Sequence, residues 1–427
     1  MEEAPPEVRR AIDAVWRIEA PRLIAGLARL VRDVGLAEEL AQDALVTALE
    51  QWPTSGIPIK PGAWLMATAK NRAIDQLRRH KLLRRKHREL GEEAERAQDS
   101  AALDIEAEAD DDVGDDLLRL IFTCCHPVLP PESRVALTLR MLGGLSTDEI
   151  ARAFLSQEAT IAQRIVRAKR TLADRQVPFE VPHGDERAPR LGSVLEVIYL
   201  VFNEGYAATA GESWIRPQLC EEALRLGRVL AAAAPDDPEV HGLVALMELQ
   251  ASRTRARQGP GGQPVLLLDQ NRAQWDQLLI GRGLAALARA EALGGASGRY
   301  ALQAAIAACH ARARTGAETD WRRIAALYGE LARVAPSPVV ELNRAVAVGM
   351  ADGPQAGLEL IDAIAGDPAL RDYHLLPSVR GDLLSKLGRF AEARAELERA
   401  AGMTRNLRER ALLLQRAAGF QKVMKDA

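Results

Sequence analysis

Aromatic residues are scarce in this 427-residue chain, at 4% of its composition. Alternating runs of Val, Ile, Thr and Tyr, which are typical of half-buried strands, are also missing. Ala, Leu, Arg and Glu are abundant instead, and these residues favour helices. The composition therefore predicts an all-α protein, and the length predicts two to four domains.

Cysteine is rare, and long apolar runs are absent. Four cysteines are too few for a disulfide framework in a chain of 427 residues. The N-terminal sequence MEEAPPEVRR has no apolar core of the kind found in signal peptides. No run reaches the roughly 18 apolar residues that a membrane helix needs. We therefore expect a soluble, cytoplasmic protein that does not associate with a membrane.

The patterns that mark catalytic and metal sites are missing as well. Cys124-Cys125-His126 would be an unusual zinc site, because a structural zinc needs four ligands and its paired cysteines are usually spaced apart. Buried structural cysteines are the favoured interpretation. No nucleophile motif, phosphate-binding glycine loop or catalytic carboxylate pair is evident. We expect no catalytic residue, no metal, no cofactor and no enzyme.

Charge is concentrated in blocks of one sign, although the net charge is only −3. Arg72 to Arg88 holds eight Lys or Arg and one acid, whereas Glu89 to Asp116 holds thirteen acids and one base. Such neighbouring blocks indicate a face that binds a polyanion, next to a segment that repels or imitates one. The acidic block has few large apolar side chains, so we expect a linker.

Helical periodicity divides the remaining chain. Residues 11–88 read as amphipathic helices interrupted by PTSGIPIKPG, and VPFEVPHGDERAPR marks a second boundary. Beyond residue 191 the chain has weak internal repeats of helix, Pro-marked turn and helix. EALRLGRVLAAAAPDDPEVHGLVALMEL is matched by RIAALYGELARVAPSPVVELNRAVAVGM, and LLSKLGRFAEARAELERAA has tetratricopeptide-like features. Such helical pairs must stack to bury their apolar faces.

The segment LSTDEIARAFLSQEATIAQRIVRAKRTL predicts two helices, over residues 147–154 and 157–172. Ser146 with Glu149 forms a capping-box pattern at the first helix. The inner face of the second helix is expected to hold Ile161, Ile165, Ala168 and Leu172. Its outer face then carries Gln and Arg, which suits a recognition helix in the major groove. An ordinary helical hairpin with a solvated basic face is the alternative.

This segment resembles region 4 of the sigma-70 family. The resemblance is carried by Gly144-Leu145-Ser146, Glu149-Ile150-Ala151, and Arg164 with Arg167-Ala168. Leu40 to Leu45, Ala63-Trp64-Leu65 and Asn71 to Arg79 resemble region 2 of the same family. The two regions stand in family order, without a region 3, as in the extracytoplasmic-function (ECF) group. The turn sequence LSQEA and the residues Asp43 and Ala44 depart from the family pattern.

The resemblance implies a role for each region. Residues expected to bind the −35 element are Thr160, Gln163, Arg164, Arg167 and Arg170. Residues expected to bind the −10 element are Asn71, Arg72, Asp75, Arg78, Arg79, Lys81, Arg84 and Arg85. Residues expected to bind core RNA polymerase are Glu39, Leu40, Gln42 and Asp43. Asn71 is the candidate base reader, but it shares a helical stripe with Trp64 and Ile74 and could equally be a half-buried, hydrogen-bonded residue.

We expect four parts: region 2 (residues 1–88), an acidic linker (89–115), region 4 (116–178) and a tetratricopeptide-like extension (179–427). The linker is either a solvated tether or, by resemblance, a nucleic-acid mimic in the polymerase cleft. The expected function is promoter-specific initiation with core RNA polymerase and promoter DNA as partners. The resemblance also implies a regulatory extension that contacts region 2, region 4 or polymerase itself.

Two other functions remain open from the sequence. One is a helix-turn-helix DNA-binding regulator with a tetratricopeptide-like sensor, which does not bind polymerase as a sigma factor. The other is an enzyme in the C-terminal half, built from two polar clusters, 203–206 and 269–276. Those clusters are expected to cap and bridge helices rather than to line a ligand groove.

Overall fold

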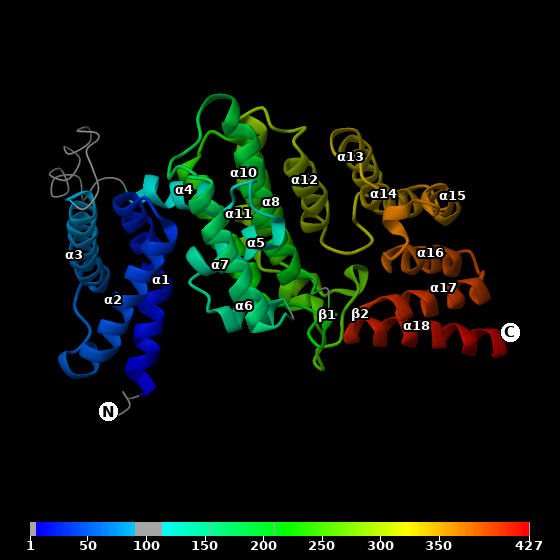
Figure 1. The fold of residues 1–427 in the computed structure, drawn as a ribbon. Coiled ribbons are helices and arrows are strands. Elements are labelled where there is room, and N and C mark those ends of the chain that lie inside the picture. The colour runs from blue at the N-terminus through cyan, green and yellow to red at the C-terminus, as the bar shows by residue number, and fades with distance from the viewer. Residues whose placement is uncertain (1–5, 90–112, 155, 209, 427) are drawn as a thin grey trace. The chain divides into compact units, whose positions relative to one another are not determined.

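The computed structural model describes residues 6–89, 113–154, 156–208 and 210–426, and these form helices joined by short connections (Figure 1). The only strands in these ranges are β1 (Ala210–Gly211) and β2 (Arg405–Asn406), which pair in parallel. The all-α prediction is confirmed. Internal contacts divide the chain into two compact units, residues 1–197 and 198–427.

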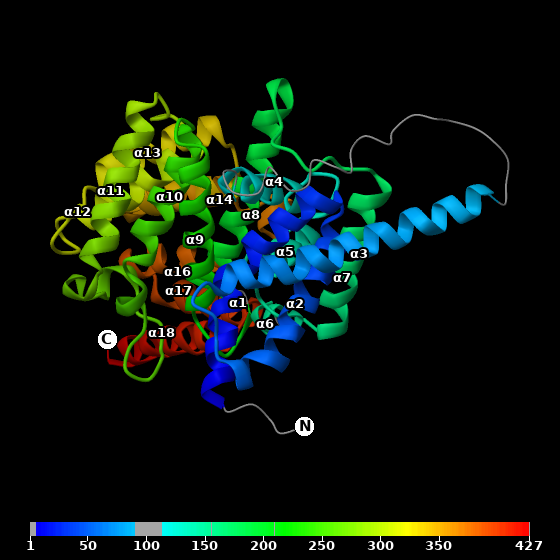
Figure 2. The same ribbon diagram turned by 90° about the vertical axis from the view of Figure 1, so that its left-hand side faces the viewer.

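The first unit begins with three packed helices, α1 (Pro6–Val31), α2 (Val34–Ser55) and α3 (Pro61–Glu89). Helices α1 and α2 approach closely because their facing positions are alanines with no exposed surface, such as Ala28, Ala41 and Ala44. Trp52 of α2 meets Trp64 of α3 edge to face, with ring centroids 5.3 Å apart. Figure 2 shows that the C-terminal half of α3 extends past α2.

A second group of helices completes the first unit. It comprises α4 (Val113–Cys124), α5 (Pro131–Met141), α6 (Thr147–Ala153), α7 (Glu158–Asp174), the short helix η1 (Gly184–Glu186) and the start of α8 (Arg187–Tyr206). Ser193 of α8 donates a hydrogen bond to the Cys125 carbonyl, and Arg190 donates to the Phe122 carbonyl at 3.1 Å. The first half of α8 therefore belongs structurally with α4.

Cys124 and Cys125 are both buried, and α8 contacts the Cys125 backbone through Ser193. Burial raises the pKa of Cys125 to about 11, and its sulfur lies 3.4 Å from the Thr138 hydroxyl. Burial lowers the pKa of His126 to about 4, and its Nδ1 accepts a hydrogen bond from the Val128 amide at 3.1 Å. The predicted interpretation of these cysteines as buried residues is confirmed. Within the described ranges, no cluster of His, Cys, Asp or Glu is arranged to hold a metal ion.

The second unit is a series of helices stacked in sequence order. They are α9 (Pro217–Ala233), α10 (Pro238–Ala251), η2 (Thr254–Arg257), η3 (Leu267–Asp269), η4 (Arg272–Gln274), α11 (Gln277–Ala292), α12 (Arg299–Arg312), α13 (Trp321–Val334), α14 (Pro338–Ala351), α15 (Pro354–Ile364), η5 (Pro368–Leu370), α16 (Leu375–Lys386), α17 (Phe390–Met403) and α18 (Leu407–Asp426). The repeated helix–turn–helix pattern predicted from the sequence is present in α9–α10 and α13–α14.

Small residues allow these helices to stack. A Cβ added at Gly357 of α15 would lie 2.8 Å from the Gly349 Cα of α14 and 2.7 Å from the Ala345 carbonyl oxygen. Asn406 fixes the end of the stack, since its buried amide donates to the carbonyls of Ala208 and Ser213 at 3.0 and 2.9 Å. The last helix of the unit is thereby joined to the segment that follows α8.

None of the described helices is long and apolar enough to cross a membrane. Most of the predicted acidic linker, residues 90–112, lies outside the described residues, so its two interpretations stay predictions. The turn residue Leu155 also lies outside them.

Candidate nucleic-acid interface

Helices α6 and α7 form the predicted helix pair. Ser146 and Glu149 cap α6 reciprocally: the Ser146 hydroxyl accepts from the Glu149 amide at 3.1 Å, and the Glu149 carboxylate accepts from the Ser146 amide at 2.8 Å. Gly144 precedes the cap with φ +62°, a backbone region in which glycine is favoured. These local features fix the start of α6 and the direction in which the chain enters it. Helix α7 follows α6 after a short turn.

One face of α7 is buried and the opposite face is exposed. Ile161, Ile165, Ala168 and Leu172 are the buried residues of the helix, as the sequence predicts. Gln163, Arg167 and Arg170 are exposed, whereas Thr160 and Arg164 are half-buried at the edges. Arg170 pairs with Asp174 at 3.5 Å, but both side chains remain largely exposed. The exposed face thus carries Gln and Arg, which are side-chain types able to hydrogen-bond base edges and phosphates.

A second basic face lies on α3. Asn71, Arg72, Asp75 and Arg78 are exposed, so the half-buried alternative for Asn71 does not hold in this fold. Trp64, by contrast, is half-buried and packs edge to face against the buried Trp52. Arg79, Lys81, Arg84 and Arg85 fall on the remainder of α3, where the side chains are outside the described set.

The residues expected to bind polymerase lie on α2 in different settings. Leu40 is buried with 3% of its surface exposed. Gln42 donates to the Glu38 carboxylate at 2.6 Å, and Asp43 pairs with Arg72 of α3 at 3.2 Å. Glu39 is exposed, and it begins a stripe with Asp43 and Val46 at helical spacing. Val46, which the sequence reasoning missed, is 52% exposed although it is apolar.

A buried carboxylate joins the two helical groups of the first unit. Glu38 of α2 is 3% exposed and accepts a hydrogen bond from the Arg140 guanidinium at 2.7 Å. Its other oxygen pairs with Lys169 of α7. Arg17 of α1 also reaches Glu149 of α6 at 2.5 Å. Nothing in the sequence around Glu38 distinguishes it from the other acids of α2, because the two cations that it binds are more than 100 residues away.

The polar clusters of the C-terminal half cap and bridge helices. Glu204 pairs with Arg216, and Asp276 caps α11. Arg272 donates to the carbonyls of His310 and Ala313 at 2.6 and 2.7 Å, and to the Thr319 hydroxyl at 2.9 Å. These contacts hold loops in place, as expected, and do not converge on one cavity with Asn203 and Asp269.

Three protein families match parts of this chain, and two of the matches cover the helices described above. The family described as "Sigma-70 region 2" matches residues 16–82, which include α2 and most of α3. The family described as "Sigma-70, region 4" matches residues 119–172, which include α6 and most of α7. A family of unknown function matches residues 190–291 in the C-terminal half.

Similar proteins match this chain over different shares of its length. A protein of Rhizobium meliloti described as uncharacterized is 43% identical over 407 residues and covers 94% of each chain. A probable ECF RNA polymerase sigma factor SigI of Mycobacterium tuberculosis is 26% identical over 176 residues, 41% of this chain and 59% of that protein. The ECF RNA polymerase sigma factor SigK of Mycobacterium ulcerans is 28% identical over 157 residues, 35% of this chain and 78% of that protein. No solved structure matches the chain.

Proposed function

Since the chain belongs to the ECF group of the sigma-70 family and carries a separate C-terminal domain, we propose that it binds core RNA polymerase and directs it to promoters with −10 and −35 elements. The observation that carries this proposal is the presence of two exposed polar faces, one on α3 and one on α7, within the two matched regions. The work is binding and strand separation, so no covalent step is required of the protein.

Region 4 would read the −35 element through α7. An α-helix fits the major groove, where Gln and Arg side chains reach base edges. Gln163 and Arg167 point outward from the middle of the helix and are the proposed base contacts. Thr160, Arg164 and Arg170 flank them and would bind the phosphate backbone, which fixes the register of the helix on the duplex.

Region 2 would open and read the −10 element through α3. The exposed amide of Asn71 can donate to and accept from the edge of an unstacked base. Arg72 and Arg78 supply positive charge beside it, and Asp75 lies on the same exposed side of the helix. Arg79, Lys81, Arg84 and Arg85 would continue this basic track along α3, which would make binding strongly dependent on salt.

Polymerase would be bound by the outer face of α2. Glu39 and Asp43 provide the charge of this face and Val46 its apolar surface. Gln42 lies beside them and is half-buried. Leu40 is buried, so it would support the face indirectly by packing α2 against the neighbouring helices. In the proposed complex, polymerase would cover Val46 together with the charged residues around it.

We assign residues 1–88 to region 2, 89–115 to the linker, 116–178 to region 4 and 179–427 to a regulatory extension. The extension is proposed to act by contacting region 2, region 4 or polymerase. The site of action would be the cytoplasm, where polymerase and promoter DNA are found.

Binding to purified core polymerase tests the proposal. The double substitution Glu39→Lys with Asp43→Lys is expected to weaken binding at least about tenfold, because it reverses the charge of the α2 face. Glu132→Lys on α5, an exposed position outside this face, is the matched control and should bind normally. Equal binding by all three proteins would remove the polymerase site from α2. No binding by any of them would favour a helix-turn-helix regulator that works without polymerase.

A further inference from the structure

The outer face of α7 carries a large apolar side chain among polar ones. Val166 is 62% exposed, and in the sequence it lies between Gln163 and Arg170, which are exposed as well. Gln163 and Arg170 belong to the face that is proposed to read the −35 element, but an apolar side chain cannot hydrogen-bond a base edge or a phosphate. The role of Val166 must therefore differ from that of its polar neighbours.

Helix geometry places Val166 on the side of α7 that faces away from the core. The buried residues of the helix are Ile161, Ile165, Ala168 and Leu172. Two residues turn an α-helix by about 200°, so the positions two before the buried ones lie nearly opposite the core. These positions form an exposed stripe of Ala159, Gln163, Val166 and Arg170. A duplex that meets both Gln163 and Arg170 along this stripe must also meet Val166, which stands between them.

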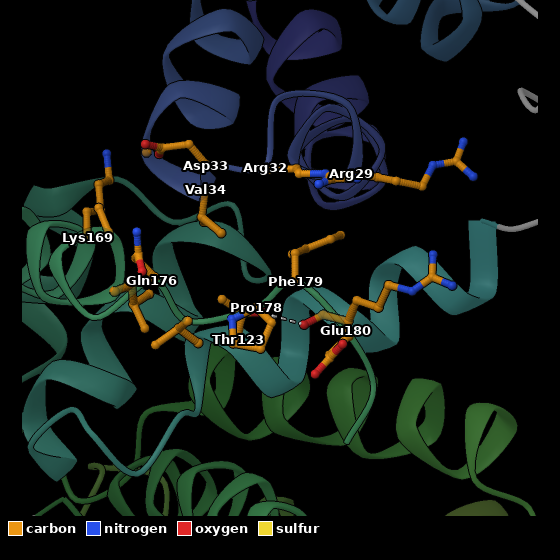
Figure 3. A pocket seen from close by; sticks show the side chains of 15 residues that line it. Arg29, Arg32, Asp33, Val34, Thr123, Lys169, Gln176, Pro178, Phe179 and Glu180 are labelled. Carbon is orange, nitrogen blue, oxygen red and sulfur yellow. Dashed lines mark hydrogen bonds between the residues drawn. The ribbon is translucent and has the colours of Figure 1, made fainter. Parts of the chain in front are cut away.

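Packing within the protein does not account for Val166. The adjacent edge of α7 faces α2, because Lys169, three residues further along, pairs with Glu38. Figure 3 shows Lys169 beside a cavity that Asp33, the N-cap residue of α2, also lines. Val166 remains largely exposed next to this contact. Helix propensity does not favour the residue either, because its branched Cβ makes Val a weaker helix former than Ala or Leu.

The major groove offers one feature that suits an apolar side chain. Thymine presents a C5-methyl group there, and no other base does. Gln and Arg on the same stripe would bind base edges and phosphates and so hold α7 in the groove. We propose that Val166 contacts the C5-methyl group of one thymine in the −35 element. This contact, which depends on the proposed function, gives the element a preferred T·A pair at one position.

Replacement of single thymines by deoxyuridine tests the contact, because deoxyuridine pairs as thymidine does but lacks the methyl group. The full-length protein is bound to core RNA polymerase, and the −35 element is located in the DNA upstream of the protein's own gene by substituting base pairs and measuring binding. Each thymine of the element, on both strands, is then replaced in turn. One replacement should weaken binding about fourfold, as expected for the loss of one buried methyl group, and the others should have little effect.

Variants of the protein assign the effect to a side chain. Val166→Ser has no methyl group and should bind the thymine and deoxyuridine duplexes equally. Val166→Ile remains apolar and should keep the fourfold preference. Val334→Ser, at a position of α13 that is 52% exposed, is the matched control and should keep it too. The ratio of affinities for two duplexes cancels any uniform loss of binding, so a partial folding defect cannot imitate the expected result.

Four results would overturn the proposal. The first is a −35 element made only of G·C pairs, and the second is wild-type binding that is indifferent to every deoxyuridine. The third is a methyl effect that persists in Val166→Ser, which would assign the contact to another residue such as Ala159. The fourth is weaker polymerase binding by Val166→Ser with an unchanged methyl effect, which would place a protein on Val166.

Failure of the proposed function would give a different result. The protein with polymerase would then bind no specific upstream element, and the thymine contact would be lost together with the promoter function. Specific binding at the −35 element that does not respond to the methyl group would leave the proposed function standing and remove only the role of Val166.

Discussion

At the scale of single residues, Glu38 is a buried charge in the contact between the two halves of the first unit. Its carboxylate is buried and meets Arg140 and Lys169, which come from α5 and α7. Promoter elements at −10 and −35 are about 25 base pairs apart, or roughly 85 Å at 3.4 Å per base pair. Since α2 and α7 touch through Glu38, they must separate if region 2 and region 4 are to occupy both elements together.

Glu38→Gln is therefore expected to destabilise the first unit by about 3 kcal/mol, because it leaves two cations without their buried partner. It should also favour the separated arrangement, and so raise transcription at limiting protein concentration. Urea unfolding measures the first effect. Glu50→Gln, an exposed position on the same helix, should change neither quantity, and equal stability of the two variants would show that the Glu38 contact is unimportant.

His310 is a second residue with a measurable consequence, in the second unit. It is 9% exposed and packs edge to face with Trp321, the ring centroids being 5.2 Å apart. Burial, with Arg253 and Arg272 nearby, lowers the pKa of His310 to about 3. The ordinary value is about 6.5, so the unfolded chain takes up the proton first as the pH falls.

The stability that His310 contributes is thus complete above about pH 6.5 and is lost as the pH falls towards 3. Between pH 7.5 and 5.5 the second unit should lose about 1.4 kcal/mol of unfolding free energy through this residue. Urea unfolding followed by tryptophan fluorescence measures the loss at both pH values. In His310→Gln the loss should be smaller by that amount. An unchanged pH dependence in this variant would contradict the account.

At the scale of elements, the helices that carry the candidate interface were predictable because their signals are local. The capping box at Ser146 and the spacing of Ile161, Ile165, Ala168 and Leu172 predicted α6 and α7 to within two residues at each end. The same spacing also predicted which face of α7 is exposed. The ion pairs of Glu38 could not be predicted, because they join residues that only the tertiary fold brings together.

The stacking of α14 on α15 depends on two glycines that face each other. Gly357→Ala should destabilise the second unit by about 2 kcal/mol, since the new methyl group would meet the Gly349 Cα and the Ala345 carbonyl. Gly329→Ala in α13 is the matched control, because a Cβ there meets nothing within 4 Å. It should stabilise by up to about 1 kcal/mol. Thermal unfolding of both variants distinguishes close packing from helix propensity, and a loss of similar size at both positions would refute the packing argument.

At the scale of the whole molecule, the sequence predicted an all-α chain with a helix-turn-helix and a C-terminal helical repeat, and the fold agrees. Helix α8 is more complex than its sequence suggests. Its first half holds α4 and α5 through Arg190 and Ser193, while its second half belongs to the other unit. The segment VPFEVPHGDERAPR indicates a boundary because it is rich in Pro and charge. Such composition does not predict whether α8 packs against the helices before the boundary or against those after it.

The central claim is that this chain is a promoter-specific initiation factor, and transcription in vitro tests it most directly. The full-length protein is mixed with purified core RNA polymerase and the DNA upstream of its own gene, and the RNA start site is mapped. The account predicts a discrete start that depends on the protein and is lost when the DNA about 10 or 35 base pairs upstream of it is altered. Binding of the protein to duplex DNA with no start under any template or salt condition would contradict it.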